Sequence, residues 1–279
     1  MIKKFWLFNK NIIISQSLVR HLNGLTSSNE NNIKILKTLF NKYDQPKSFE
    51  HLLEKHPNLS KLTKAAVLIP ISVRETSAQK YETFYSLTQR TPNLRFYGGQ
   101  ICFIGGKLDA TDENAVEAAK REAKEEVDIP SERLTILAQM HPLIITNIGK
   151  DSFLLYPIVA YYDDKNFAPT LNKEEVECVY ELPTERFLSS ENHEIAHVEL
   201  TDVEFHLHYF NDVINRQEIT IWSITALISI VVSTILHNRA PPFDIDPIVK
   251  LDPNNVNKFF DEFVSKSIKL LEHFHRPEH

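Results

Sequence analysis

The chain has 279 residues, of which 42% are hydrophobic and 24% are charged, and its formal net charge is −6. This length allows one substantial domain with extensions, or two small domains. The apolar content excludes a disordered chain, and the acidic balance excludes a general nucleic-acid binder, which needs a basic surface. Only six residues are glycine, where roughly 7% would be usual, and four of the six lie close together: Gly98, Gly99, Gly105 and Gly106.

Two features bear on the cellular compartment. The first 29 residues contain neither Asp nor Glu, and apolar side chains alternate with four cations: Lys3, Lys4, Lys10 and Arg20. That composition is typical of a mitochondrial transit peptide, although an ordinary basic helix packed on the domain would have it too. The only cysteines, Cys102 and Cys178, are too few for a disulfide framework or a zinc-ligand set. We therefore expect reduced thiols in or near the core, and a mitochondrial location with peroxisomal or cytoplasmic alternatives.

Residues 30–62 predict one or two polar helices, because Ile33, Leu36 and Phe40 recur at helical spacing. From residue 63 the pattern changes to short runs of apolar and β-branched residues. These runs predict strands at residues 65–71, 82–90, 133–139, 153–162, 176–182 and 199–210. Strands that surround a few helices without regular alternation indicate a mixed α/β (α+β) domain over residues 63–240.

Helices are predicted at residues 112–127, 219–237 and 254–272, the last within a helical C-terminal tail over residues 241–279. Residues 219–236 carry no formal charge over 18 positions, which reaches the nominal length of a membrane span. Six of these 18 residues are Ser or Thr. We therefore expect a buried helix here and no transmembrane span.

The segment from Asp112 to Val127 carries the most informative chemical pattern. Its small and apolar residues share one arc of the helix, which would pack on the core. Glu122, Glu125 and Glu126 lie at i, i+3 and i+4 on an adjacent arc, where their charges repel unless a cation lies among them. Mg²⁺ binds such carboxylates while it retains waters and substrate phosphates. The alternative is a solvated Glu/Lys-rich helix.

Neighbouring residues support a site at this helix. Arg121 lies four residues from both Glu117 and Glu125, so it can brace the acidic face. Gly105 and Gly106, upstream of the helix, permit a tight turn and a close approach of the backbone to a ligand. We therefore expect these glycines to form a turn that points the helix at the ligand.

The order of these residues resembles the signature of the Nudix hydrolases, Mg²⁺-dependent enzymes that cleave nucleoside diphosphates linked to another group. Lys107 and Asp128 depart from the signature, because most members have glycine at both positions. The resemblance implies a Nudix-like α/β/α sandwich with a mixed sheet and helical extensions at both ends. The positions that match are Glu113, Arg121, Glu122, Ala123, Glu125, Glu126 and Ile129.

An upstream pattern resembles the coenzyme A diphosphatase branch of this family, which is peroxisomal or mitochondrial in eukaryotes. Ile104 replaces the proline that usually precedes the two glycines, and Ser223 replaces glycine in a Trp-Gly-x-Thr-Ala helix start. The resemblance covers about residues 65–240. Its upstream part comprises Leu87-Thr88-Gln89-Arg90, Arg95, Gly99, Phe103-Ile104-Gly105-Gly106, Lys107 and Asp109.

This resemblance implies hydrolysis of the diphosphate of coenzyme A or acyl-CoA, giving 3′,5′-ADP and 4′-phosphopantetheine or its acyl form. Glu122 and Glu126 would hold Mg²⁺ or Mn²⁺, and Glu125 would be a third ligand or the base that deprotonates water. Arg121 completes the implied catalytic set. The implied substrate contacts, which suit phosphates best at the two arginines, are Arg90, Arg95, Gly99, Gly105, Gly106 and Lys107.

Three functions remain open on the sequence. They are a coenzyme A or acyl-CoA diphosphatase, a Nudix hydrolase of another substrate such as ADP-ribose or a dinucleotide, and a non-catalytic nucleotide-binding module. Arg90, Arg95 and Lys107 favour the first over the second, and the intact glutamates favour an enzyme over the third. Glu174 and Glu175 are candidates for an additional base. We expect a small-molecule partner and no nucleic acid, and the oligomeric state stays open.

Two histidine patterns suggest other chemistry. Residues 193–197, His-Glu-Ile-Ala-His, fit a zinc protease motif that requires a long helix, and the strand-like run at 199–210 leaves no room for one. His206 and His208 alternate along a strand and therefore share a face. We expect this pair to be hydrogen-bonded or exposed rather than to bind a metal.

Overall fold

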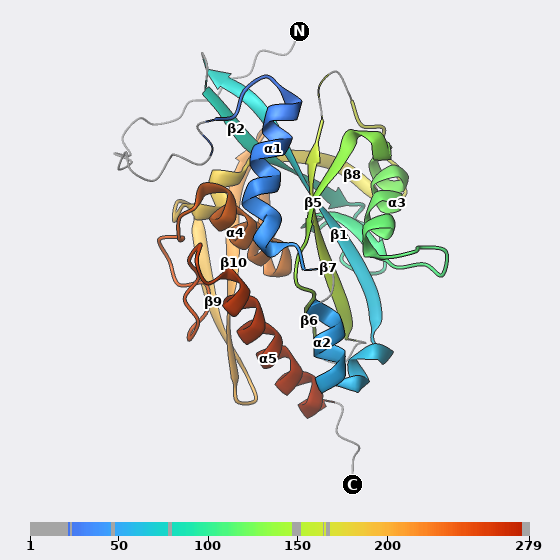
Figure 1. Cartoon of the computed structure of the whole chain (residues 1–279), viewed down its shortest axis with the longest axis vertical. Coiled ribbons are helices and arrows are strands. Elements are labelled where there is room, and N and C mark those ends of the chain that lie inside the picture. The colour runs from blue at the N-terminus through green and yellow to red at the C-terminus, as the bar shows by residue number, and fades with distance from the viewer. Residues whose placement is uncertain are drawn as a thin grey trace.

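The computed structural model describes residues 22–274, apart from residues 23, 46–47, 78–79, 147–151, 164 and 166–167. Residues 1–21, with all four cations of the predicted transit peptide, lie outside the described residues. The described elements form a mixed sheet between two helical layers (Figure 1). Helix α3 (Ala115–Val127) covers one face, and α4 (Ser223–His237) and α1 (Asn29–Phe40) cover the other. The predicted mixed α+β fold is confirmed.

The sheet is built around β1 (Thr63–Ser77). Strand β1 pairs in parallel with β7 and in antiparallel with β2 and β4. Strands β5 and β6 follow beyond β7, and β3 and β8 follow beyond β2. These seven strands are β2 (Lys80–Arg90), β3 (Ile101–Cys102), β4 (Ile104–Lys107), β5 (Leu134–Gln139), β6 (Leu143–Ile145), β7 (Phe153–Tyr162) and β8 (Val176–Pro183).

Strand β1 is buried on both faces of the sheet. Ala66 and Leu68 pack in the apolar cluster that contains α3, whereas Ile69 and Ile71 pack in the cluster that contains α4. A strand covered on both sides has no polar face, which explains why its sequence is a continuous apolar run. The position of α3 over β1 and β4 places the acidic helix against the centre of the sheet.

Helix α4 begins at Ser223, so the predicted start at residue 219 is wrong. Residues 217–222 form β11 (Gln217–Trp222), in which Ile219 and Ile221 are buried and Thr220 between them is exposed. This two-residue alternation is typical of a half-buried strand. The absence of charged residues, on which the predicted helix is based, does not distinguish a strand from a helix. Ser223 follows with a φ of +57°, a left-handed conformation that glycine adopts most easily.

The buried helix predicted for this region is confirmed. Every residue of α4 from Thr225 to Leu236 is buried. None of the helices in the described part of the chain is long and apolar enough to cross a membrane.

The single strand predicted at residues 199–210 is also wrong. The chain forms β9 (His193–Leu200) and β10 (Val203–Ile214), which pair in antiparallel around a turn at Thr201. Thr201 takes a φ of +58°, a conformation for which the sequence has no glycine signal. Strand β11 pairs with β10 and completes a separate three-stranded sheet.

The two ends of the described chain pack on this framework. Helix α2 (Ser48–Lys55) precedes β1, and α5 (Val256–Phe274) contacts β6 and β10. The helices predicted in residues 30–62 and at 254–272 are therefore present. Cys102 and Cys178 are free and half-buried, as predicted.

His237, the last residue of α4, should give a measurable pH dependence of stability. Burial lowers the pKa of its imidazole to about 4, and its Nε2 atom lies 2.8 Å from Thr184 Oγ1. The unfolded chain binds this proton more tightly, so the free energy of unfolding should fall by up to about 3 kcal/mol as the pH drops from about 6.5 to about 4. In urea titrations across this range, His237→Gln should show a shallower fall than the parent protein. An identical slope would contradict the prediction.

Candidate functional site

Helix α3 begins at Ala115 because Asn114 caps its N-terminus. The Asn114 side-chain oxygen accepts hydrogen bonds from the backbone N–H groups of Val116 and Glu117, at 2.9 and 3.1 Å. The helix thus starts three residues after the predicted residue 112. Its small residues pack on the sheet and bring the helix axis close to it: Ala115, Ala118, Ala119 and Ala123.

Asp128 ends α3 at a position where the Nudix signature has glycine. It takes the left-handed conformation, with a φ of +56°, and its N–H donates to the carbonyls of Ala123 and Lys124. Asp tolerates this conformation better than most residues. Lys124 also forms an ion pair with the Asp128 carboxylate. The C-terminus of α3 is therefore capped although the glycine of the signature is absent.

Gly105 and Gly106 lie in strand β4, so the turn predicted for them is wrong. A Cβ atom on Gly105 would lie 2.2 Å from the carbonyl oxygen of Ala66 in β1. A Cβ atom on Gly106 would lie 2.4 Å from Glu122 Oε1 in α3. The two glycines are needed because β4 passes close to β1 and to the carboxylate of the acidic helix.

Glu122, Glu125 and Glu126 of α3 divide into a largely buried pair and an exposed member. The side chains of Glu122 and Glu126 are 12% and 3% exposed, whereas that of Glu125 is 53% exposed. Burial, together with the charge of Glu122, raises the pKa of Glu126 to about 8. Burial also raises the pKa of Glu122, against an opposing effect of Arg121. A cation bound to both carboxylates would offset their mutual repulsion.

Arg121 braces this acidic face through hydrogen bonds to three carboxylates. Its guanidinium donates to Asp112 at 3.0 and 3.1 Å, to Glu122 at 3.0 Å and to Glu125 at 2.8 Å. The predicted contact with Glu125 is therefore present, whereas the exposed Glu117 pairs with Lys120. Asp112, which the sequence did not single out, has its pKa lowered by Arg121.

Arg90 and Glu175 approach the buried pair from other elements. Arg90 Nη1 lies 3.9 Å from Glu126 Oε1, and Arg90 Nε is buried without a hydrogen-bond partner. The charge of Glu175 raises the pKa of both Glu122 and Glu126. Glu174 is exposed. Of the two acidic residues considered as a base, Glu175 is thus the one that acts electrostatically on the site.

The other predicted substrate contacts lie at the edge of the site. Arg95 is exposed on the loop after β2, and its guanidinium lies 5.2 Å from the ring centroid of Phe96. Gly99, with a φ of +76°, donates its N–H to the Arg90 carbonyl at 3.0 Å. Lys107 is exposed at the end of β4, where its carbonyl accepts from Arg121. Gly99 and Lys107 are hydrogen-bonded through their backbones to Arg90 and Arg121 beside the carboxylate pair, and Arg95 has no such hydrogen bond among the described residues.

The donor set of the site fits a hard divalent cation. Among the described residues, no three His, Cys, Asp or Glu side chains are grouped to hold a metal. Mg²⁺ at phosphate-processing sites needs only one or two carboxylates, because substrate phosphates and waters complete its octahedron. Glu122 and Glu126 supply two such buried carboxylates, with the cationic Arg90 beside them for the phosphates.

His206 and His208 on β10 are hydrogen-bonded, as predicted. His193 Nε2 lies 3.0 Å from His208 Nδ1, and His208 Nε2 lies 2.9 Å from the Ile245 carbonyl oxygen. His206 Nδ1 lies 3.1 Å from the Asp244 carbonyl oxygen. The zinc protease pattern lies on a strand, without the helix that such a site requires.

Comparison with known families agrees with the acidic helix, the glycine pair and the mixed sheet. The NUDIX domain model matches residues 64–204, about half of the chain. The chain belongs to the Nudix family. The match includes β4, all of α3 and the segment that carries Glu175, so the carboxylate pair lies inside the Nudix domain.

Individual Nudix proteins are similar over part of the chain. Nudix hydrolase 15, mitochondrial, of Arabidopsis thaliana is 29% identical over 68% of this chain and 65% of its own length. Peroxisomal coenzyme A diphosphatase NUDT7 of Mus musculus is 28% identical over 66% of this chain and 74% of its own length. A solved Ap4A hydrolase of C. elegans is 25% identical over 44% of this chain and 82% of its own, with a TM-score of 0.34. The chain thus spans just under two thirds of the Arabidopsis protein.

Proposed function

We propose that this protein hydrolyses the diphosphate bond of coenzyme A or acyl-CoA, with Mg²⁺ or Mn²⁺ as cofactor. The observation that carries the proposal is the buried pair of Glu122 and Glu126 beside Arg90, three groups suited to a diphosphate and its cation. Two features of the chain support coenzyme A as the substrate. One is the branch pattern around Arg90 and residues 105–109, and the other is the similarity to a mouse protein named coenzyme A diphosphatase.

The proposed reaction is the addition of one water molecule across the diphosphate. A base removes a proton from the water, and the water oxygen bonds to one phosphorus. The bond between that phosphorus and the bridging oxygen breaks, and its electron pair stays on the departing phosphate. A bound divalent cation neutralises the diphosphate and acidifies the attacking water. Glu122 and Glu126 would hold that cation, with the exposed Glu125 as a third ligand or as the base.

The remaining residues orient the substrate and the carboxylates. Arg90 would bind a phosphate oxygen through the Nε atom that has no hydrogen-bond partner in the protein. Arg121 would fix Glu122 and Glu125 through its hydrogen bonds, since Asp112 holds it from the other side. Glu175, in the turn before β8, is a candidate for an additional base.

A product assay tests the proposal. The purified protein should be incubated with Mg²⁺ and coenzyme A, ADP-ribose or a dinucleotide, and the products identified by mass spectrometry. We expect 3′,5′-ADP and 4′-phosphopantetheine from coenzyme A. Cleavage of ADP-ribose or the dinucleotide with coenzyme A untouched would replace the proposed substrate, and no cleavage with retained nucleotide binding would indicate a non-catalytic module.

We also propose that residues 1–29 direct the chain to mitochondria. Their basic, acid-free composition supports this, and one relative carries the name of that compartment. A fluorescent fusion of these residues should label mitochondria. A peroxisomal or diffuse cytosolic signal would contradict the proposal.

A further inference from the structure

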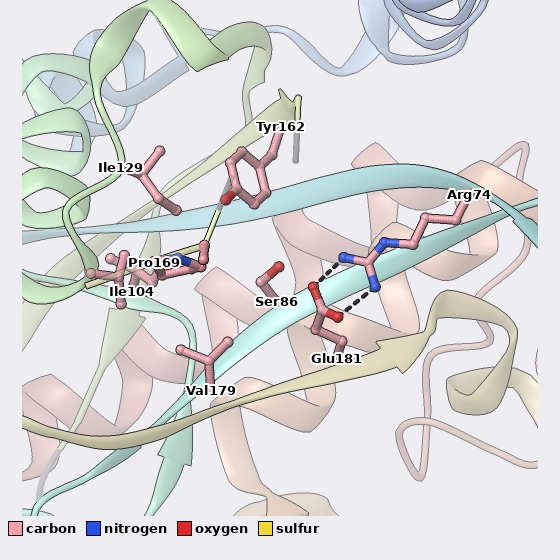
Figure 2. A pocket seen from close by; sticks show the side chains of 10 residues that line it. Arg74, Ser86, Ile104, Ile129, Tyr162, Pro169, Val179 and Glu181 are labelled. Atoms are coloured by element: carbon pink, nitrogen blue, oxygen red, sulfur yellow. Dashed lines mark hydrogen bonds and ion pairs between the residues drawn. The ribbon is translucent and has the colours of Figure 1, made fainter. Parts of the chain in front are cut away.

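Beside α3, the face of the sheet is hollowed into a groove of about 500 Å³. Figure 2 shows apolar side chains such as Ile104, Ile129 and Val179 at one end of this sheet groove. The ion pair of Arg74 and Glu181 lies at the other end. Ser86 lies between the two ends. The volume falls within the range of small-molecule sites, roughly 300–1,000 Å³.

The apolar end of the sheet groove adjoins the buried carboxylates. Val127, the residue after Glu126 in α3, lines the groove. On β2, Ser86 and Arg90 lie four residues apart and face the same side of the sheet, a span of about 13 Å. A substrate with its diphosphate beside Glu126 and Arg90 would therefore meet the apolar end first, then Ser86 and then the ion pair.

We propose that the sheet groove binds the pantetheine arm of coenzyme A, an inference that rests on the proposed function. In this arm a branched dimethyl carbon lies one methylene away from the phosphate, a hydroxyl group follows it, and the two amides lie farther out. The groove presents its groups in the same order, with Val179 and its apolar neighbours before the polar ones. The hydroxyl of Ser86 and the charges of Arg74 and Glu181 suit the amide N–H and C=O groups.

The order of apolar and polar groups along the sheet groove also selects against diphosphates that are linked to a sugar. A ribose in place of the arm would press most of its hydroxyl groups against Ile104, Ile129 and Val179, where the Tyr162 hydroxyl is the one polar side-chain group in the described lining of that end. An apolar wall disfavours polar groups because their hydrogen bonds to water are lost and not replaced, and not because of their size. The sheet groove therefore makes the protein selective for an arm that is apolar next to the diphosphate.

A binding experiment without metal tests this assignment separately from catalysis. Val179→Phe would fill the groove, and Val213→Phe makes the same change at an exposed position of β10. Calorimetry in EDTA should show that Val179→Phe weakens binding of 4′-phosphopantetheine at least tenfold and leaves 3′,5′-ADP within twofold. Val213→Phe should leave both ligands unchanged. Unaltered binding of 4′-phosphopantetheine to folded Val179→Phe would overturn the proposal.

A second variant covers the case in which Val179→Phe does not fold. Val179→Thr keeps the volume but introduces a hydroxyl into the apolar end. The ratio of kcat/KM for coenzyme A to that for ADP-ribose should fall at least threefold. A parent protein that cleaves no coenzyme A would refute the proposed function, whereas active coenzyme A cleavage with an unchanged ratio in Val179→Thr would refute the groove assignment alone.

Discussion

Glu126→Gln should lower kcat for coenzyme A at least about 10³-fold, which corresponds to about 4 kcal/mol of transition-state stabilisation. Glu126 is the more buried of the two carboxylates proposed to hold the cation, and Gln keeps its shape without its charge. Because burial raises the pKa of Glu126 to about 8, the fold already disfavours the charged form. The variant should therefore melt at the same temperature as the parent near pH 7, or higher. Steady-state assays and thermal melts measure the two effects.

Glu117→Gln is the matched control on the same helix. Glu117 is exposed and pairs with Lys120 at 2.8 Å, away from the buried pair. Its replacement should leave kcat within about twofold, as surface substitutions usually do. If Glu126→Gln retained the activity of this control, the carboxylate pair would not be the catalytic centre.

Replacing each of the two adjacent glycines of β4 by alanine should affect a different property, stability at Gly105 and activity at Gly106. Gly105→Ala should lower the free energy of unfolding by about 3 kcal/mol or more, because the new Cβ would lie 2.2 Å from a backbone oxygen of β1 and the φ of +154° is strained for alanine. Gly106→Ala should fold, because the atoms it would meet are at the end of the Glu122 side chain and not in the backbone. Its kcat should fall about 10²-fold as that carboxylate is displaced.

Gly24→Ala serves as the control for the glycine series. Its Cβ would meet only the end of the Ile35 side chain, at 3.0 Å, so stability and activity should change little. Urea titration and coenzyme A turnover should be measured on all three variants. Equal losses of stability at Gly105 and Gly106 would contradict the distinct roles of the two positions.

The acidic helix could be predicted from the sequence because its pattern is local. Glu122, Glu125 and Glu126 lie on one stretch of α3, and helical periodicity places them on one side. The distinction between the buried pair and the exposed Glu125 could not be predicted, since it depends on how β4 passes under the helix. Glu175 is distant in sequence, and only the pairing of β8 with β2 brings its loop to the site.

The errors in the predicted fold have a common physical cause. Residues 217–222 and the turn at Thr201 lie in the three-stranded sheet, where apolar and polar residues alternate across several element boundaries. Apolar content identifies such a region as ordered but does not fix where a strand ends. The turn predicted for Gly105 and Gly106 failed for a related reason. Glycine is required both for turns and for close packing, and the sequence does not distinguish the two.

The surroundings of the carboxylate pair are assembled from parts of the chain that are far apart in sequence. The Asn172 N–H donates to the Glu126 carbonyl at 2.9 Å, and the Thr91 N–H donates to the Glu175 carbonyl at 2.8 Å. Loops more than 40 residues long must therefore close before the site exists, and such non-local contacts form late in folding. Recovered activity after refolding thus reports completion of the whole domain, whereas recovered helix content reports only its local segments.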